Sequence, residues 1–329
     1  MVMKLVVAAA LALLLDAPAS AQDATTAWPT RPVTMIVPFP AGGPVDLVAR
    51  LLSQRLTETL GQPVIVENIG GAGGMTGAAR VAKSPPDGSM FVFGTQGSHT
   101  FSQMLYKKPL YDAVKDFAPV AVVVENSKLL LTRKDLPVNN LQEFITYAKA
   151  NQAKLQFGSA GTGSATHVAC VLLNNTIGAD ITHVPYRGTA PAMQDVVAGR
   201  IDYICEIVST AQPFVQAGMV KPIALLATER SRVYPDLPTA DEQGLKGFAA
   251  DGWNAFFFPK DTPEPIVRKL AKATSDILDV PEVHDRLESF GLNVPPRERR
   301  TPEYLEKLVR SDLEKWAPPV KASGAMASE

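Results

Sequence analysis

The chain has 329 residues, with 32 Lys and Arg residues against 33 Asp and Glu residues and a formal net charge of −1. This balance argues against nucleic acid or an acidic membrane surface as a partner. The length predicts two domains that share a substantial apolar core.

Residues 1–21 have the pattern of a cleaved export signal. Lys4 supplies the positive start, residues 5–15 are an unbroken apolar run, and Ala19-Ser20-Ala21 matches an A-x-A cleavage site. A run this short is a poor membrane span, and no cysteine follows the cleavage site to carry a lipid. We therefore predict a periplasmic protein whose mature form begins near Gln22.

Residues 33–60 predict a strand, a glycine turn and a helix. Residues 33–37 are apolar and β-branched, and Pro38 ends the strand. From Val45 onward, apolar residues recur every three or four positions, as in an amphipathic helix. The turn and the first helical turn contain Pro40, Ala41, Gly42, Gly43 and Asp46. Because such a helix start has unpaired N–H groups and attracts anions, we expect this turn to bind a carboxylate.

Strands and helices alternate through the next stretch of the chain. The pattern predicts strands at 62–68 and 90–93, a helix over about 78–83 and a short helix from about Thr100. Such alternation is typical of a parallel α/β sheet. Residues 70–77 loosely resemble a dinucleotide-binding loop, but an exported protein has little access to such cofactors, so we predict a simple connection and no cofactor. The last strand is followed by Thr95, Gln96, Gly97, Ser98 and His99.

The strand, turn and helix pattern recurs more than a hundred residues after its first occurrence. Residues 155–158 are a predicted strand, and residues 166–173 are a predicted helix. The turn between them contains Ser159, Ala160, Gly161, Thr162, Gly163 and Ser164. Two such units, one in each domain and facing across a cleft, would hold one small ligand.

The rest of the chain continues the alternation and ends in helices. Residues 234–244 are polar and rich in proline, which indicates a surface connection. Residues 253–258 are an apolar strand, and three helices follow it. The remaining predicted strands are 117–124, 129–132, 183–186, 201–205 and 222–227, and the remaining helices are 141–151, 190–198, 212–217, 264–278, 281–290 and 302–316.

Few side chains point to catalysis or metal binding. The chain has no G-x-S-x-G turn and no phosphate loop, and its four histidines lack metal-ligand spacing. His99 and His167 each follow a glycine or serine turn, so each either lines the cleft or satisfies a local backbone group. The other two histidines are interpreted as structural. Glu206, after the strand that ends at Cys205, either accepts a hydrogen bond from the ligand or is solvated.

The two cysteines, Cys170 and Cys205, lie in a predicted helix and at the end of a predicted strand. An oxidising compartment allows a disulfide between them. Both stretches are apolar, however, as is usual for buried free thiols. The sequence therefore favours two free thiols over a bridge, since it does not show whether the cysteines come within bridging distance.

Short motifs recur in a characteristic order along the chain. They are Trp28-Pro29, Pro38-Phe39-Pro40-Ala41-Gly42-Gly43, Gly71-Ala72-Gly73-Gly74, Pro86-Asp87-Gly88, Ser159-Ala160-Gly161, His183-Val184-Pro185-Tyr186 and Pro235-Asp236-Leu237-Pro238-Thr239. In this order and spacing, the motifs resemble the Bug-type solute receptors of tripartite tricarboxylate transporters. The resemblance extends over essentially the whole mature length.

The resemblance implies a type II periplasmic-binding-protein fold. This α/β fold has two α/β domains, a ligand cleft between them and two crossovers. The expected division is 22–124 for the first domain, 125–228 for the second, and 229–329 for the part that returns to the first. The family also implies that main-chain amides of the two glycine turns, with ordered waters, capture a carboxylate for delivery to a membrane permease.

We therefore predict a monomeric periplasmic receptor, not an enzyme, for a small organic mono- or dicarboxylate. Residues 40–43 and 160–164 are expected to grip one carboxylate, while residues 95–99 and Cys205-Glu206 sense the rest of the ligand. His167 is also an expected ligand-binding residue. The expected partners are permease subunits, with no metal and no nucleic acid. Two alternatives share the pocket, namely an exported enzyme acting on a small carboxylate and a signalling receptor that senses one.

Overall fold

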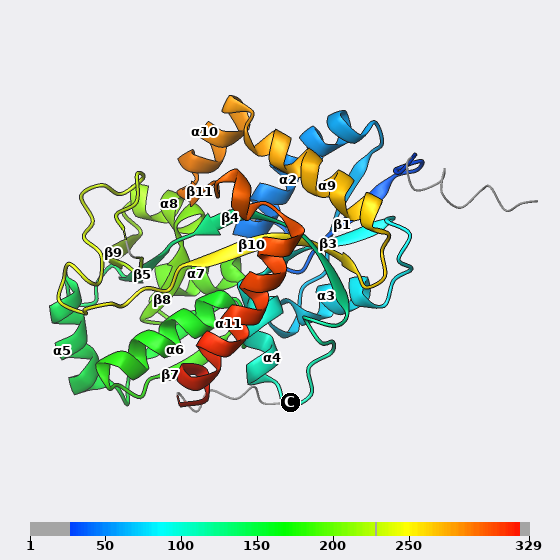
Figure 1. Cartoon of the computed structure of the whole chain (residues 1–329). Helices are drawn as coiled ribbons and strands as arrows, with labels where there is room; N and C mark the ends of the chain where they lie inside the picture. The colour runs from blue at the N-terminus through cyan, green and yellow to red at the C-terminus, as the bar shows by residue number, and fades with distance from the viewer. Residues whose placement is uncertain (1–26, 228, 323–329) are drawn as a thin grey trace, which may run out of the picture.

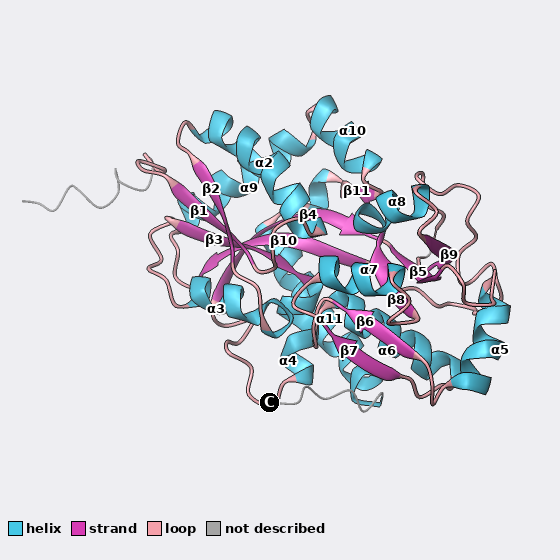
Figure 2. Ribbon diagram, turned by 180° about the vertical axis from the view of Figure 1, so that it is seen from behind, coloured by secondary structure: helices cyan, strands magenta, loops and turns pink. Residues whose placement is uncertain are grey.

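The computed structural model describes residues 27–227 and 229–322. The predicted export signal at 1–21 and the start near Gln22 lie outside these residues. Within them the chain forms two α/β domains, each built around one mixed sheet (Figures 1 and 2). A search of the described helices finds none that is long and apolar enough to cross a membrane.

The first sheet has six strands in the order β11-β4-β10-β3-β1-β2. They are β1 (Val33–Val37), β2 (Val64–Asn68), β3 (Met90–Thr95), β4 (Phe117–Asn126), β10 (Gly252–Pro259) and β11 (Leu292–Asn293). The first three strands pair in parallel, as their alternation with helices predicts. Strand β10 inserts antiparallel between β3 and β4, so the sheet is mixed. The paired residues of β10 are 126–142 positions from those of β4 and 159–165 positions from those of β3, so local patterns do not reveal this insertion.

Helices cover both faces of this sheet because its strands are apolar on both sides. Met35 and Phe256 belong to a core beneath α2 (Pro44–Leu60) and α9 (Glu264–Leu278). Their neighbours Ile36 and Phe257 face the opposite side and pack in another core with α3 (Met75–Ala82) and α11 (Pro302–Ala322). The shorter elements of this domain are η1 (Ala72–Gly74), η2 (Gly97–Phe101), α4 (Ser102–Leu105), α10 (Pro281–Ser289) and η3 (Arg297–Arg299).

The second sheet has five strands in the order β7-β6-β8-β5-β9. They are β5 (Lys128–Arg133), β6 (Gln156–Ser159), β7 (Thr182–Pro185), β8 (Tyr203–Ile207) and β9 (Val220–Leu225). Strand β6 runs parallel to β7 and β8, whereas β5 is antiparallel to β8 and β9. The helices of this domain are α5 (Leu141–Asn151), α6 (Ala165–Ile177), α7 (Thr189–Val197) and α8 (Val208–Gln216).

Two crossovers and one long helix connect the domains. Ser127 alone separates β4 from β5, and residues 226–251 return the chain from β9 to β10. Helix α11 then runs from the first domain toward the second (Figure 1). Trp316 near its end packs edge-on against Phe101, with 5.5 Å between ring centroids, beside the core of the second domain.

The expectation of two free thiols is wrong. Cys170 in α6 and Cys205 in β8 form a disulfide, with 5.4 Å between their Cα atoms. Helix α6 packs on the second sheet so that both side chains enter the same core. The apolar surroundings do mark both cysteines as buried, but the pairing depends on how the helix lies across the strand.

We expect the bridge to stabilise the second domain, because it closes a loop with a sequence separation of 35 residues. A cross-link over a loop of this size contributes about 3–4 kcal/mol in the chain-entropy model. The double substitution Cys170→Ala and Cys205→Ala should lower the free energy of unfolding by this order, as measured by urea denaturation. Reductant should destabilise the wild type and leave the double variant unchanged. Equal sensitivity of both proteins would contradict the prediction.

Candidate functional site

A small cavity lies between the two domains, and residues from both of them line it. The space open to water-sized molecules is about 50 Å³, and one water needs about 10–15 Å³ on this measure, so only a small molecule fits. The lining residues are Phe39, Pro40, Ala41, Gly43, Pro44, Val45, Thr95, Asn126, Ala160, Ser164, Ala165, Thr166, Gly188, Thr189, Ala190, Pro191, Ile207, Gly252, Trp253 and Asn254. None of these described lining residues has an ionisable side chain.

Three helices begin at this cavity. Helix α2 contributes Val45, α6 contributes Ala165 and Thr166, and α7 contributes Thr189 and Ala190. No described residue accepts a hydrogen bond from the backbone N–H groups of these five residues. Because the positive ends of three helix dipoles also meet here, the cavity favours an anion although it contains no cationic side chain.

The first glycine turn borders the cavity through Pro40, Ala41 and Gly43. Gly42 does not line it and adopts a left-handed φ of 82°. Its N–H donates to Asp46 Oδ2 at 2.9 Å. Asp46, predicted to be a ligand-binding residue, is 2% exposed and lies outside the cavity lining. Its carboxylate holds the turn in shape.

The charge of Asp46 is maintained by its neighbours. Burial on its own would raise the pKa of this carboxyl group. Hydrogen bonds from Arg50, Gly42 and Asn68 outweigh burial and hold the pKa of Asp46 below its usual value. The charged form therefore persists at neutral pH and keeps its three donors in place.

The second glycine turn borders the cavity through Ala160 and Ser164, while Ser159, Gly161, Thr162 and Gly163 are not among the lining residues. Ser164 caps α6, because its Oγ accepts from the N–H of His167 at 3.2 Å. His167 Nδ1 in turn accepts from the N–H of Gly163 at 3.2 Å. Of the two expectations for His167, satisfaction of a local backbone group is therefore the one that the structure matches.

His183, interpreted as structural, supports the same turn. Its Nε2 lies 2.7 Å from Ser159 Oγ, which also accepts from the N–H of Gly161 at 3.1 Å. The rings of His183 and His167 stack with 4.0 Å between centroids. Burial lowers the pKa of His183 to about 4 and that of His167 to about 3. Both rings are therefore neutral at pH 7, which lets His167 act as an acceptor.

Of the stretch from residue 95 to residue 99, only Thr95 lines the cavity. Gln96 donates to Asp312 Oδ2 at 2.8 Å, and Ser98 bonds to the backbone N–H of Thr95. His99 is fully buried and stacks on Phe257 with 4.0 Å between ring centroids, so its ring packs in the core and not in the cavity. Its Nδ1 lies 2.9 Å from the hydroxyl of Ser98, and its Nε2 has no hydrogen-bond partner among the described residues, so His99 fits neither the expected contact with an anion nor the expected role of satisfying a backbone group.

Cys205 and Glu206 are also absent from the lining, where their neighbour Ile207 takes part. Strand β8 extends past Cys205 through Ile207, so Glu206 is fully enclosed, and the expectation of a solvated carboxyl group is wrong. Its Oε1 accepts from the N–H of Ile207 at 2.8 Å and from Thr210 Oγ1 at 2.6 Å. Burial raises the pKa of Glu206 to about 7.

Sequence reasoning missed fourteen of the twenty lining residues. Gly188, Thr189 and Pro191 form a helix start whose glycine and proline were a usable signal. Asn126 and Asn254 are polar residues near the ends of apolar strands, which is a weaker signal. The remaining missed residues are Phe39, Pro44, Val45, Ala165, Thr166, Ala190, Ile207, Gly252 and Trp253.

Glycines allow the two domains to approach closely. A Cβ atom on Gly73 would lie 2.4 Å from the carbonyl oxygen of Thr162, and one on Gly97 would lie 2.8 Å from the backbone nitrogen of Ala165. Gly188 similarly faces the ring of Pro40, at 3.0 Å. Since backbone atoms have little freedom to retreat, a side chain at Gly73 or Gly97 would hold the domains apart.

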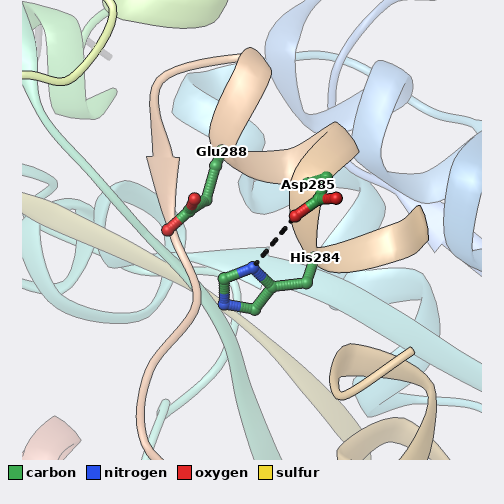
Figure 3. A group of neighbouring side chains, drawn as sticks. All are labelled: His284, Asp285 and Glu288. Atoms are coloured by element: carbon green, nitrogen blue, oxygen red, sulfur yellow. Dashed lines mark ion pairs between the residues drawn. The ribbon is translucent and has the colours of Figure 1, made fainter. Parts of the chain in front are cut away.

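A group with metal-ligand geometry occurs at a distance from the cavity lining. Among the described residues, His284, Asp285 and Glu288 of α10 have potential ligand atoms within 4.8 Å of one another (Figure 3). Asp285 is exposed, and both carboxylate oxygens of Glu288 accept from Arg232, at 2.8 and 2.7 Å. The ion pair with Arg232 therefore accounts for the position of the Glu288 carboxylate.

The protein has two α/β domains and, between them, a cavity at which three helices begin. This arrangement defines a two-domain solute-binding protein. The model of the tripartite tricarboxylate transporter family receptor (TctC) matches residues 48–325, and the chain belongs to this family. It is a periplasmic solute-binding receptor of the TctC/Bug type. The predicted family and the predicted type II fold are therefore confirmed.

Three solved structures of similar proteins share this fold. MatC (Rpa3494) from Rhodopseudomonas palustris, solved with bound malate, is 43% identical, with a TM-score of 0.86 over 89% of this chain and 100% of that one. The periplasmic binding protein BugD is 37% identical, with a TM-score of 0.87 over 92% and 100%. Rpa4515 from R. palustris, solved with adipate, is 32% identical, with a TM-score of 0.86 over 90% and 98%.

The glycine contact between the domains leads to a test in solution. Gly97→Ala should shift the protein toward a more open shape, because the added Cβ meets backbone atoms of the second domain. Small-angle X-ray scattering should show a larger radius of gyration with unchanged secondary structure. Gly218→Ala is the control for contact between the domains, since a Cβ there meets nothing within 4 Å and its left-handed φ of 63° confines the strain of the added methyl group to the end of α8. An unchanged radius for Gly97→Ala would contradict the predicted role of this contact.

The stacked histidines predict acid sensitivity. The folded pKa values of His183 (about 4) and His167 (about 3) lie below the ordinary value of 6.5, so the unfolded chain takes up protons first as the pH falls. The free energy of unfolding should therefore decrease from about pH 6.5 toward pH 4. His183→Gln should flatten this dependence in urea titrations. A parallel pH dependence in wild type and variant would refute the assignment.

Proposed function

We propose that this chain is an extracytoplasmic solute receptor that binds a small organic carboxylate through backbone amides and delivers it to a membrane permease. The observation that carries the proposal is the meeting of three helix starts, with unpaired N–H groups, at one cavity between two domains. The glycine turns place small residues beside these amides, so a carboxylate has unobstructed access to them.

The energetics require several amides to act together. A hydrogen bond to a charged group contributes about 1.5–3 kcal/mol, and a helix dipole adds up to about 2 kcal/mol. Micromolar affinity needs about −8 kcal/mol after the costs of ordering the ligand and the domains. One helix start is marginal on this basis, whereas helix starts from both domains suffice once the cleft has closed.

The ligands of similar proteins support this chemistry. MatC was solved with malate and Rpa4515 with adipate, and both ligands are dicarboxylates. The conserved fold and the uncharged cavity of this chain are compatible with the same class. The matched family is one of binding receptors, and no catalytic step forms part of the proposal.

The crossovers support a hinge between the domains. The first consists of Ser127 and its flanking strand ends, and the second spans residues 226–251. We propose that the second domain, residues 125–228, rotates about these segments as one body relative to 22–124 and 229–329.

We further propose that the chain is exported through a cleaved signal at residues 1–21 and acts as a monomer.

A thermal-shift screen tests the ligand class. The mature protein, from Gln22, would be screened against aliphatic, amino and aromatic carboxylates. A ligand at a hundred times its dissociation constant should add about 2.7 kcal/mol to the free energy of unfolding. The dimethyl ester of succinate is the matched control, because it keeps the carbon chain and removes both charges. The proposal fails if no carboxylate raises the melting temperature, or if the hit is chemically converted.

A titration followed by amide NMR tests the mode of binding. The largest shifts should fall on the N–H groups of Val45, Ala165 and Thr189, because these are the unpaired donors at the three helix starts. Leu141 is an internal control, since it begins a helix in the second domain but already donates to Gln243. If the largest shifts fell on residues outside the cavity, the carboxylate would bind elsewhere and the proposed role of these amides would be wrong.

A further inference from the structure

Two asparagines form one wall of the cavity. Asn126 ends β4 and Asn254 lies in the adjacent β10, with exposed fractions of 4% and 5%. Asn126 Nδ2 donates to Asn254 Oδ1 at 2.9 Å. Because each amide group has one accepting and one donating end, this bond leaves Asn126 Oδ1 and Asn254 Nδ2 for other partners.

A buried lysine fixes the orientation of the pair. Lys128 is 1% exposed, and its Nζ donates to the carbonyl oxygen of Ala250 at 2.6 Å. The same ammonium faces Asn126 Oδ1 at 3.5 Å. If the Asn126 amide were reversed, its NH2 group would face the Lys128 ammonium, and both groups are donors. The ammonium therefore keeps Asn126 Oδ1 directed toward itself. Asn126 Nδ2 must then face Asn254, which must present its oxygen.

This orientation leaves Asn254 Nδ2 as a donor at the cavity. No described residue accepts a hydrogen bond from it. Some buried polar atoms, such as Gln96 Oε1, have neither a hydrogen-bond partner nor contact with solvent. Asn254 Nδ2 is not one of these atoms, so it remains accessible. A buried residue that borders the cavity thus presents an N–H group that has no acceptor in the described protein.

Gly252 makes this arrangement sterically possible. A Cβ atom at this position would lie 3.0 Å from Lys128 Nζ and 3.1 Å from Asn126 Oδ1. Even the smallest side chain would therefore push the ammonium or the amide that it orients by a few tenths of an ångström. Gly252 also lines the cavity, so the lysine lies directly behind its wall without contacting the interior.

We propose that Lys128, Asn126 and Asn254 form a relay that selects ligands whose far end is a hydrogen-bond acceptor. With the first carboxylate at the helix starts, Asn254 donates to a second carboxylate, so dicarboxylates bind in preference to amino acids that place an ammonium group there. The inference rests on the proposed function and specifies its substrate class. The uncharged lining supports it, because no described carboxylate in the cavity wall is available to an ammonium group.

Succinate and 4-aminobutyrate test the relay, since both have four carbon atoms and a carboxylate at one end. At the far end succinate has a second carboxylate, whereas 4-aminobutyrate has an ammonium group. Isothermal titration calorimetry on the wild type should show succinate binding at least tenfold more tightly. Asn254→Asp replaces the donor with an acceptor of the same shape. It should reduce the affinity for succinate and improve that for 4-aminobutyrate, changing their ratio at least a hundredfold.

Asn174→Asp is the matched control. Asn174 is also 5% exposed but lies in α6, where its Oδ1 accepts from the hydroxyl of Tyr203 at 2.6 Å. An aspartate can still accept that bond, so the ligand ratio should stay at the wild-type value. A change in ratio equal to that of Asn254→Asp would overturn the proposal.

The possible failures are distinguishable. If the wild type binds no carboxylate of any class, the proposed function fails. If it binds carboxylates but treats succinate and 4-aminobutyrate alike, the relay is refuted while the receptor function stands, and this measurement does not depend on a variant folding. An unchanged ratio in a folded Asn254→Asp protein also refutes the relay.

Discussion

The unpaired N–H groups at the starts of three helices are the feature on which the rest of this structure depends. In an open cleft, water satisfies these donors, but closing the domains removes bulk water from them. A buried donor without an acceptor costs about 1–3 kcal/mol, so closure of the two domains without a ligand between them is unfavourable. In the proposed function, an anion supplies the missing acceptors and meets the positive ends of α2, α6 and α7 at once. The proposed function therefore makes ligand binding and domain closure parts of one equilibrium.

Close approach of the domains sets a second constraint. The amides of α6 reach the cavity because Gly73 and Gly97 let the second domain come within contact of the first. The turns themselves are held from behind, by Asp46 in the first domain and by the His167–His183 stack in the second. The residues that line the cavity are uncharged, whereas the residues that hold the two turns from behind carry the carboxylate and imidazole groups.

The region behind the cavity concentrates buried polar groups near the crossovers. Lys128 and Glu206 are both enclosed, and burial shifts the pKa of Lys128 down to about 8 and that of Glu206 up to about 7. Neither forms a direct salt bridge among the described residues, although each affects the charge of the other. Such groups cost stability. Lys128 directly follows Ser127, where the chain passes between the domains, and Glu206 lies on the adjacent strand β8 opposite Leu129. An apolar core would have been more stable there, but it would offer no oriented donor to a polar ligand.

The sequence by itself determined the family, the type of fold and the two strand–turn–helix units, because these depend on local chemistry. Proline and glycine end strands, apolar periodicity defines helices, and small residues before a helix leave its amides open. The tertiary structure decided which of those residues line the cavity. It buried His99 and Glu206, paired Cys170 with Cys205, inserted β10 into the first sheet, and brought α7 and Asn254 to the site. These outcomes depend on contacts between segments far apart in the chain, whose geometry arises only when the sheets and helices pack.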